Sequence, residues 1–291
     1  MSRSLDSEEV FDGVRFPGYI HTPESLQAAC SFQFQDTDVL LVTFPKSGTT
    51  WMQQILSLIF CKGDLWPIHH RPNWARMPWL EHISFQGFLA QWDPAQPRLL
   101  TTHLHAKALA PALKKSKARV VYVARHPKDV LVSFYHFHRM ASFLPDPSSF
   151  QDFMDEFLQG TGFYSSWFDH VKGWLSLLQD LNMLLITYEE LHQEPRSTLQ
   201  KLTRFLGHPL SPQEEDVVLC HSSFAFMSQS SVTNYSLVPR EVMDPARSSF
   251  MRKGVVGDWQ EHFTPEQNAK FNAVYQAQMG DCGLHLPWTM D

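Results

Sequence analysis

The sequence has no long hydrophobic run and no excess of positive charge. No apolar stretch approaches the roughly 18 residues needed to span a membrane, and the N-terminus, MSRSLDSEEVFDG, lacks the apolar core of a signal peptide. The 24 Lys and Arg against 30 Asp and Glu give a net charge of -6, so bulk charge does not favour nucleic-acid binding. We therefore expect a cytoplasmic protein that binds neither membranes nor nucleic acid and holds anionic ligands through local cationic clusters.

Cysteine is also scarce, and no Cys-x-x-Cys pair occurs. This scatter fits free thiols in a reducing compartment better than a disulfide framework or a zinc site. The four cysteines are Cys30, Cys61, Cys220 and Cys282. The histidine pairs 69–70, 103/105 and 136/138 could suggest a metal, but no cysteine or carboxylate ligand pattern accompanies them. We expect no metal.

Strand and helix patterns alternate along the chain. Apolar, β-branched runs at residues 39–44, 98–102, 118–124 and 182–188 predict strands, each followed by polar residues and a helical pattern. This order predicts a single α/β domain over residues 1–291, with a parallel sheet covered by helices on both faces. Ligands of such sheets bind at the carboxyl ends of the strands. Phe44 and Pro45, His103, Arg125 and Tyr188 lie at those ends.

Two further segments are rich in aromatic residues and proline. Residues 14–23 mix aromatic residues with Pro and Gly, which predicts an ordered loop leading into a short helix near residues 24–30. Residues 63–98 hold five prolines and four tryptophans, which predicts a packed irregular segment because a flexible linker would not carry so much aromatic surface. That segment could equally wall a pocket or form a satellite core under a long loop.

The strand over residues 39–44 leads into a short loop with small hydroxyl side chains and one lysine, and then into a helical pattern. A strand, tight loop and helix in this order predict a binding site for phosphate or a similar anion. The Walker A pattern does not fit, because Thr43 stands where its first glycine should be and Lys46 precedes Gly48. A nucleoside triphosphatase or kinase is therefore the weaker hypothesis.

The run TFPKSGTTW, from Thr43 to Trp51, resembles the 5′-phosphosulfate loop of the cytosolic sulfotransferases. The resemblance extends from about residue 35 to residue 280, with the family's motifs in order. It implies a P-loop-like fold and 3′-phosphoadenosine 5′-phosphosulfate (PAPS) as co-substrate, with no metal. It also implies that the loop binds the 5′-phosphosulfate and that Lys46 stabilises charge developing on its oxygens. The loop residues so implicated are Lys46, Ser47, Gly48, Thr49, Thr50 and Trp51.

Thr101-Thr102-His103-Leu104-His105 resembles the family segment that carries the catalytic base. The match implies that His103 takes the proton of the acceptor hydroxyl, a role that suits imidazole at neutral pH. The lysine of phenol-type members is absent at Thr101, as it is in hydroxysteroid-type members. His105 replaces the usual proline.

Three later segments resemble the family's nucleotide-binding motifs. Residues 125–133 match the 3′-phosphate motif, with His126 in place of asparagine, and imply that Arg125 and Ser133 hold that phosphate. Residues 222–224 imply a hydroxyl contact and a ring stacked opposite Trp51 against adenine. Residues 252–259 match Arg-Lys-Gly-x-x-Gly-Asp-Trp, whose cations can close over a phosphate. The residues concerned in the last two segments are Ser222, Phe224, Arg252, Lys253 and Gly254.

The acceptor is the least determined part of the prediction. The missing lysine and the run from Ser166 to Trp174 favour an alcohol such as a hydroxysteroid, whereas residues 249–252 look more like phenol-type members. A pocket lined by Phe16, Trp79 and Phe137 would accept an apolar body of either kind. We keep two alternatives: a nucleotide or nucleoside kinase of related fold, and a nucleotide-binding protein without transfer activity.

Many family members dimerise through a Lys-x-x-x-Thr-Val-x-x-x-Glu segment, whose counterparts here are Gln260, Thr264, Pro265 and Ala269. Only the threonine is retained, so an isologous contact between the charged ends loses its attraction. Thr264-Pro265-Glu266-Gln267 instead predicts the start of a helix. We expect a monomer, or a dimer built on another surface.

Overall fold

Four short strands form the central sheet of the computed structural model, which describes the chain except for residues 1–3, 62–63, 94, 281–282, 284–285 and 291. All four strands are parallel and lie in the order β4-β3-β5-β6. Their bounds are β3 (Val39–Thr43), β4 (Leu99–Thr102), β5 (Arg119–Ala124) and β6 (Met183–Thr187). The predicted parallel sheet is confirmed, and each strand lies within its predicted range.

The register of the sheet brings the carboxyl ends of the strands to one edge. Val42 in β3 pairs with Thr102 in β4 and with Tyr122 in β5, and Ala124 pairs with Thr187 in β6. The segments that follow the strands therefore begin side by side, which is the arrangement that places a ligand site at this edge.

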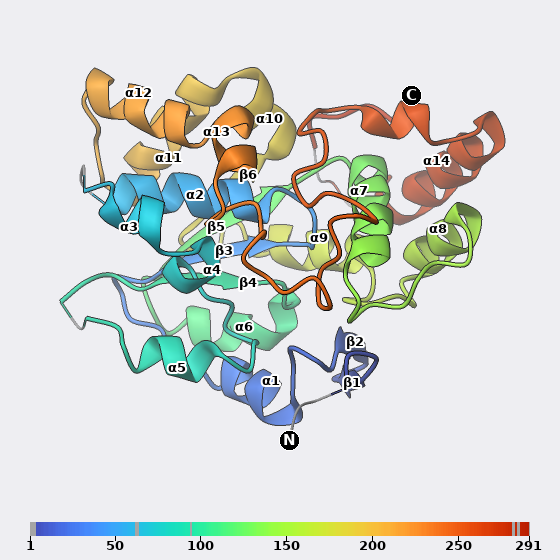
Figure 1. Cartoon of the computed structure of the whole chain (residues 1–291), viewed down its shortest axis with the longest axis horizontal. Coiled ribbons are helices and arrows are strands. Elements are labelled where there is room, and N and C mark those ends of the chain that lie inside the picture. The colour runs from blue at the N-terminus through green and yellow to red at the C-terminus, as the bar shows by residue number, and fades with distance from the viewer. Residues whose placement is uncertain (1–3, 62–63, 94, 281–282, 284–285, 291) are drawn as a thin grey trace.

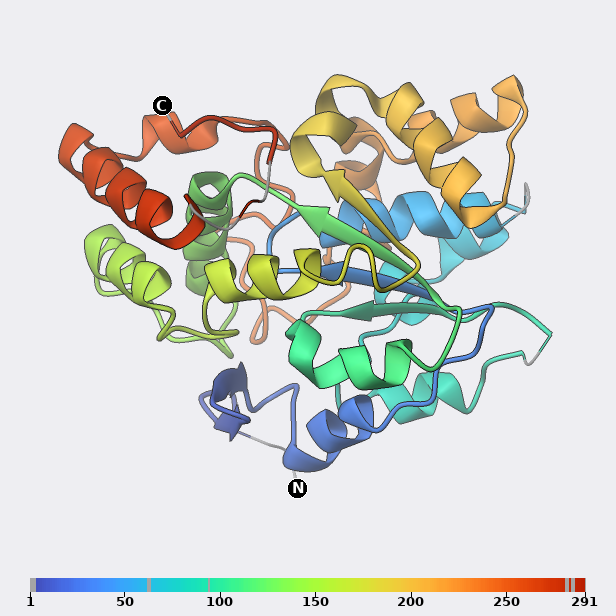
Figure 2. The same cartoon turned by 180° about the vertical axis from the view of Figure 1, so that it is seen from behind.

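Helices cover both faces of the sheet (Figures 1 and 2). Leu40 and Val42 of β3 belong to one hydrophobic core, whereas Val39 and Leu41 belong to the other, as the alternation of side chains along a strand requires. The first core is closed by α1 (Pro23–Cys30), α6 (Ala106–Leu113), α7 (Pro127–Met140) and α9 (Trp167–Leu175), and the second by α2 (Thr49–Phe60), α11 (Pro195–Leu206) and α12 (Pro212–His221). The fold is thus a single α/β domain with its sheet buried between two helical layers.

The helices have the following bounds: α1 (Pro23–Cys30), α2 (Thr49–Phe60), α3 (Trp66–His70), α4 (Asn73–Arg76), α5 (Phe85–Leu89), α6 (Ala106–Leu113), α7 (Pro127–Met140), α8 (Phe150–Gln159), α9 (Trp167–Leu175), α10 (Tyr188–Gln193), α11 (Pro195–Leu206), α12 (Pro212–His221), α13 (Phe224–Gln229), α14 (Pro265–Met279) and the 3-10 helix η1 (Asp258–Glu261). The predicted helix start at Thr264 is confirmed. Its side chain accepts a hydrogen bond from the Gln267 N–H in a capping box at the beginning of α14.

An N-terminal hairpin corrects the prediction for residues 14–23. Strand β2 (Val14–Pro17) pairs antiparallel with β1 (Glu8–Phe11), where we expected only a loop. The turn between them holds Asp12 at φ 53° and Gly13 at φ 78°, as a two-residue hairpin turn requires. The Asp-Gly pair was therefore a usable signal, although the four-residue strands were too short to show a clear alternation.

The described residues of the segment 63–98 are packed, as predicted, but they also form the short helices α3, α4 and α5. The middle part of this segment runs beside β4: Trp79 forms a parallel bridge with Thr101, and the Leu80 N–H donates to the Thr101 carbonyl at 2.9 Å. This pairing carries Trp79 and the residues after it to the carboxyl end of β4.

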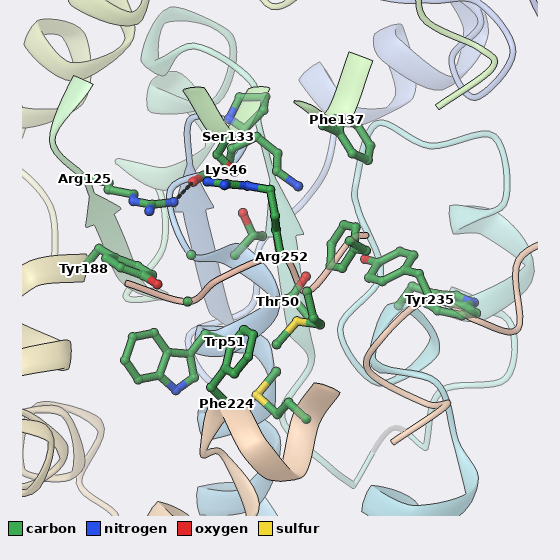
Figure 3. A pocket seen from close by; sticks show the side chains of 18 of the residues that line it. Lys46, Thr50, Trp51, Arg125, Ser133, Phe137, Tyr188, Phe224, Tyr235 and Arg252 are labelled. Atoms are coloured by element: carbon green, nitrogen blue, oxygen red, sulfur yellow. Dashed lines mark hydrogen bonds between the residues drawn. The ribbon is translucent and has the colours of Figure 1, made fainter. Parts of the chain in front are cut away.

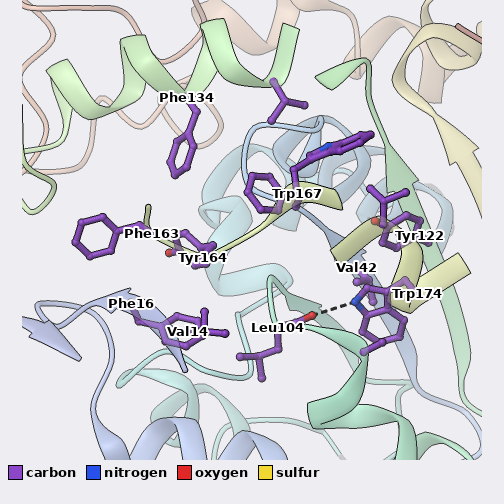
Figure 4. Packing of buried hydrophobic residues seen from close by; sticks show 14 of the residues in the cluster. Val14, Phe16, Val42, Leu104, Tyr122, Phe134, Phe163, Tyr164, Trp167 and Trp174 are labelled. Atoms are coloured by element: carbon purple, nitrogen blue, oxygen red, sulfur yellow. Dashed lines mark hydrogen bonds between the residues drawn. The ribbon is translucent and has the colours of Figure 1, made fainter. Parts of the chain in front are cut away.

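Helix α9 places the aromatic run before residue 174 in the core. Trp167 and Trp174 are fully buried, and the Trp174 indole N–H donates to the Leu104 carbonyl at 3.0 Å (Figure 4). Because Leu104 directly follows His103, this bond ties α9 to the chain that leaves β4.

Within the described part of the chain, no helix has both the length and the hydrophobicity needed to cross a membrane. Cys30, Cys61 and Cys220 are thiols, and Cys282 lies outside the described residues. The histidine pairs do not gather with other ligands, since no group of three or more His, Cys, Asp or Glu in the described ranges could hold a metal ion.

Candidate active site

One cavity of about 630 Å³ opens at the carboxyl ends of the strands (Figure 3). It collects residues from distant parts of the sequence, including the loop after β3, the ends of β4 and β5, and the segment over residues 250–255. The predicted site residues that line it are Lys46, Gly48, Thr49, Thr50, Trp51, Trp79, His103, Arg125, Ser133, Phe137, Tyr188, Ser222, Phe224, Arg252, Lys253 and Gly254.

Two of the predicted residues do not line this cavity. Ser47 is buried within the loop after β3, at 1 % exposure. Phe16 is 2 % exposed and packs edge-on against Tyr164 at 5.6 Å between ring centroids, with Tyr164 itself lining the cavity (Figure 4). Phe16 therefore supports the wall from behind, because β2 belongs to the hairpin that sequence reasoning had placed in a loop.

The loop between β3 and α2 has the backbone of an anion site. Lys46 and Gly48 adopt left-handed conformations, at φ 69° and 98°, and a Cβ on Gly48 would lie 2.9 Å from the Tyr188 ring. Gly48 caps α2 without a side-chain hydrogen bond. The N–H groups of the first turn are therefore left for a ligand, at the helix end that favours negative charge.

Arg125 joins three parts of the site. Its Nη1 donates to the Lys46 carbonyl at 3.1 Å, and its Nη2 donates to the Val255 carbonyl at 3.2 Å. The guanidinium also lies 4.1 Å above the Tyr188 ring centroid. Figure 3 shows Arg125 beside the loop of Lys46 and above Tyr188. The cation is thereby held at the edge of the cavity.

The segment after residue 251 is shaped by two carboxylates. Asp258 accepts hydrogen bonds from both Arg252 and Lys253. Asp129 on α7 accepts from the backbone N–H of Gly257 at 2.7 Å and of Trp259 at 2.9 Å. Buried acceptors of this kind fix the path of a loop, so both cations line the same cavity as Arg125.

Gly254 lets this segment approach α13. It has φ 67°, and a Cβ at this position would lie 2.2 Å from the Phe224 ring. Phe224 remains 38 % exposed, and Figure 3 places it next to Trp51 on one side of the cavity. Ser222 lines the cavity nearby, although its hydroxyl donates to the Val218 carbonyl at 2.7 Å.

The surroundings of His103 determine which of its ring nitrogens carries the proton. Its Nδ1 lies 2.8 Å from the Thr43 carbonyl, and because a carbonyl only accepts, Nδ1 carries the proton and Nε2 keeps its lone pair. Burial lowers the pKa of His103 to about 4, and the nearby Lys46 charge acts in the same direction. The ring is therefore neutral at physiological pH and has a basic nitrogen to offer.

Glu81 is a site residue that sequence reasoning missed. It is fully buried, and its two carboxylate oxygens accept from the His103 N–H at 2.7 Å and from the Thr102 hydroxyl at 2.9 Å. Burial raises its pKa to about 7. Only the pairing of residues 78–80 with β4 brings Glu81 there, and no local pattern in the sequence marks it.

Tyr164 was also missed as a wall of the site. Its ring stands edge-on to the His103 ring at 5.6 Å, and its backbone is left-handed at φ 63°. The His105 Nε2–H donates to the Tyr164 carbonyl at 3.0 Å. His105, which departs from the family pattern, thus supports the strained turn that brings Tyr164 to His103.

His126, the other departure, caps α7. Its Nδ1 accepts from the Lys128 N–H at 3.3 Å, its Nε2–H donates to the Thr289 carbonyl at 3.0 Å, and its ring stacks on Trp259. Burial lowers its pKa to about 4. A neutral histidine with both nitrogens bonded serves here as an N-cap, the position that asparagine also favours.

Lys46 lies where the cationic and aromatic parts of the cavity meet. Its Nζ is 4.2 Å from the ring centroid of Phe137 (Figure 3). It is 4.3 Å from the ring centroid of Phe250. Burial, together with the charges of Arg125 and Arg252, lowers its pKa to about 7. An anion placed among these three cations would reverse that effect and stabilise charged lysine.

The remainder of the cavity is predominantly apolar. Trp79 and Phe137, which we predicted as pocket residues, are joined by side chains that the sequence did not single out. These include Ile20, Trp74, Phe88, Phe143, Tyr164, Tyr235, Val242, Met243 and Phe250. Such a lining suits an apolar ligand whose reactive group reaches His103.

The family model of the sulfotransferase domain matches residues 36–283. The chain is 42% identical to sulfotransferase 2B1 of Mus musculus, over 96% of this chain and 82% of that protein. It is 41% identical to a 3-beta-hydroxysteroid sulfotransferase of Cavia porcellus, over 96% of both chains. The crystal structure of mouse sulfotransferase SULT7A1 complexed with PAP superimposes with a TM-score of 0.79 at 29% identity, over 96% of this chain and 95% of that one. Together with the cavity described above, these matches show that this chain belongs to the sulfotransferase family.

Proposed function

We propose that this sulfotransferase moves the sulfuryl group from PAPS to a hydroxyl of a small apolar acceptor, with His103 as the general base. One observation carries the proposal. The unprotonated Nε2 of His103 belongs to a side chain that lines the same cavity as Lys46, Arg125 and Arg252 on one side and aromatic residues on the other. A base at the junction of a cationic and an apolar compartment suits transfer from an anionic donor to an apolar alcohol.

The residues present fit the donor. The uncapped first turn of α2 and Lys46 suit the 5′-phosphosulfate, and Arg125, Ser133 and Arg252 suit the 3′-phosphate. Trp51 and Phe224 offer aromatic surface for adenine. The mouse SULT7A1 structure, solved with PAP, supports this assignment.

In the reaction, His103 accepts the hydroxyl proton as the acceptor oxygen forms a bond to sulfur. The bond between sulfur and the bridging phosphate oxygen breaks, and 3′-phosphoadenosine 5′-phosphate departs. Lys46 and the N–H groups of the loop stabilise the charge that develops on the departing oxygen. Glu81 and the Thr43 carbonyl hold His103 in the orientation that its role needs.

An alcohol is the acceptor that the residues favour over a phenol. Thr101 is fully buried, and its hydroxyl donates to the Met77 carbonyl at 2.9 Å, so this position offers no cation to a phenolate. The 41% identical relative from Cavia porcellus is a 3-beta-hydroxysteroid sulfotransferase.

We also assign the protein to the cytoplasm. We further propose that residues 1–291 form a single domain.

The kinase hypothesis is not favoured, because the family model and the relatives described above are sulfotransferases. The hypothesis of a nucleotide-binding protein without transfer activity is also weakened. The two residues that depart from the family pattern, His105 and His126, have structural contacts of their own and leave His103 accessible to the cavity.

One assay separates the three hypotheses. The protein is incubated with sulfur-labelled PAPS or with phosphorus-labelled ATP, each with and without EDTA, over a panel of alcohols and phenols. We expect label to be transferred from PAPS and not from ATP. EDTA should not change the rate of transfer, and alcohols should react faster than phenols. Transfer from ATP that stops with EDTA would establish a kinase, and nucleotide binding without any transfer would establish a binding protein.

A further inference from the structure

His82 is a polar side chain in the aromatic part of the cavity that the reaction proposed above does not use. Its ring stacks on Trp79, with centroids 5.2 Å apart and planes inclined by 12°. The His21 ring meets it edge-on at 5.0 Å. Two aromatic contacts at right angles hold the imidazole in a defined orientation.

The imidazole of His82 has no hydrogen bond to any residue that the structure describes, even though it borders the cavity. Burial lowers its pKa well below the ordinary value, so the ring is neutral and presents one N–H and one lone pair. His21 does not hydrogen-bond to it, because the His21 Nδ1 lies 2.9 Å from the Pro17 carbonyl and its Nε2 has no hydrogen-bond partner among the described residues. The hydrogen-bonding capacity of His82 is therefore left for a ligand.

The position of His82 relative to the base follows from Trp79. The Trp79 ring lies 5.2 Å from His82 and 5.9 Å from His103, between centroids. Residues 78–80 are fixed beside β4 by the bridge to Thr101. Since both imidazoles border the cavity and contact the same indole, an acceptor whose hydroxyl reaches His103 has other atoms of its skeleton near His82.

We propose that His82 is a specificity-determining residue that hydrogen-bonds a second hydroxyl of the acceptor, close on the skeleton to the hydroxyl that reacts. The inference rests on the proposed function. A hydroxyl suits either nitrogen of a neutral imidazole, because it can donate to the lone pair or accept from the N–H. A skeleton without this hydroxyl would cover the imidazole and leave it unpaired, which disfavours that acceptor.

The test compares three acceptors built on one rigid apolar skeleton: a mono-ol, a diol with the second hydroxyl near the first, and a diol with the second hydroxyl at the far end. Wild-type protein should have its highest kcat/KM with the near diol. His82→Phe keeps an aromatic ring on Trp79 but removes both nitrogens. It should lower kcat/KM for the near diol by roughly 2- to 12-fold, the range of one neutral hydrogen bond. For the mono-ol and the far diol the same change should leave kcat/KM unchanged or raise it, because these acceptors no longer cover an unpaired imidazole.

The chain offers a matched control in His70, which stacks on Trp66 at 4.9 Å and 14° outside the cavity. His70→Phe should alter the kcat/KM of none of the acceptors. If His82→Phe fails to fold, as judged by thermal unfolding, then His82→Asn and His82→Gln provide the same comparison and should keep part of the preference.

Two results would overturn the inference while leaving the proposed function intact: an equal effect of His82→Phe on all three acceptors, or a wild-type preference for the far diol. Failure of the wild-type protein to sulfonate any member of the panel, with PAP binding intact, would instead remove the proposed function and this inference with it.

Discussion

At the scale of single residues, the site depends on a histidine that is kept neutral. The hydrogen bond from Nδ1 to the Thr43 carbonyl and the burial of the ring act together, since one sets the tautomer and the other lowers the pKa to about 4. A neutral imidazole with a fixed tautomer has its Nε2 lone pair available at any physiological pH.

His103→Ala should therefore lower kcat by roughly 10²–10⁴-fold, the usual contribution of a general base. Nucleotide affinity should stay within a few-fold of wild type, because proton removal matters in the transition state and not in binding the donor. Turnover measured with saturating PAPS, together with PAP binding by calorimetry, checks both expectations. Activity within a few-fold of wild type would remove His103 from this role.

The arginines give a second prediction at this scale. Arg125→Ala and Arg252→Ala should each weaken PAP binding by about 1.5–3 kcal/mol, the range for a hydrogen bond to a charged group. Affinity for an analogue without the 3′-phosphate should be nearly unaffected by either change. Equal losses with both nucleotides would place the two arginines away from the 3′-phosphate.

At the scale of elements, the site depends on where helices begin. Helix α2 starts at a glycine with φ 98° that lies against Tyr188, and α7 starts at His126, which caps it. Both starts follow directly from strands of the sheet, so helix N-termini and strand ends meet at one edge.

Gly48→Ala should weaken PAP binding at least 10-fold, because a left-handed conformation costs an L-residue about 1–2 kcal/mol and the new methyl group would press on the Tyr188 ring. Gly87→Ala in α5 is the control, since a Cβ there would meet nothing within 4 Å. Calorimetric titration of both variants with PAP decides the matter. Unchanged affinity in Gly48→Ala would show that the loop tolerates another backbone path.

At the scale of the whole molecule, buried neutral histidines couple stability to pH. His126 and His138 are each about 5% exposed or less, and burial lowers the pKa of both to about 4 from an ordinary 6.5. Between these values the unfolded chain binds protons that the folded chain does not, so stability decreases as the pH falls from 6.5 towards 4.

Each such histidine contributes a slope of up to about 1.4 kcal/mol per pH unit in this window. Urea unfolding measured at several pH values between 4 and 7 should show this loss. His138→Phe, which keeps a ring among Phe134, Phe153 and Phe163, should have a shallower slope than wild type. A free energy of unfolding that is flat across the window in both proteins would contradict the neutral assignment.

Assembly is the second prediction for the whole molecule. Thr264 begins α14 with a capping box, and Pro265 follows it at the first helical position. Since the charged ends of the family's dimer segment are absent, we expect a monomer, or a dimer through another surface, at micromolar concentration. Sedimentation equilibrium gives the mass. A dimer that dissociates in Thr264→Arg would show that the family interface persists.

The sequence by itself determined the sheet and the anion loop, because both depend on contiguous residues. An apolar run such as 39–43 has a local pattern, and so does the loop around Gly48, whose backbone only glycine accommodates easily. The family resemblance added His103, Arg125 and Arg252. The register of the strands brings His103 and Arg125 to one cavity, and the bonds to Asp129 and Asp258 place Arg252 there.

The tertiary structure alone decided what surrounds the base. Glu81 and Tyr164 come to His103 through the pairing of residues 78–80 with β4 and through the turn held by His105. Phe16, by contrast, was turned behind the wall by the N-terminal hairpin. Strand periodicity reports which face of its own element a residue occupies, whereas a cavity wall depends on contacts between distant segments, and these leave no local pattern in the sequence.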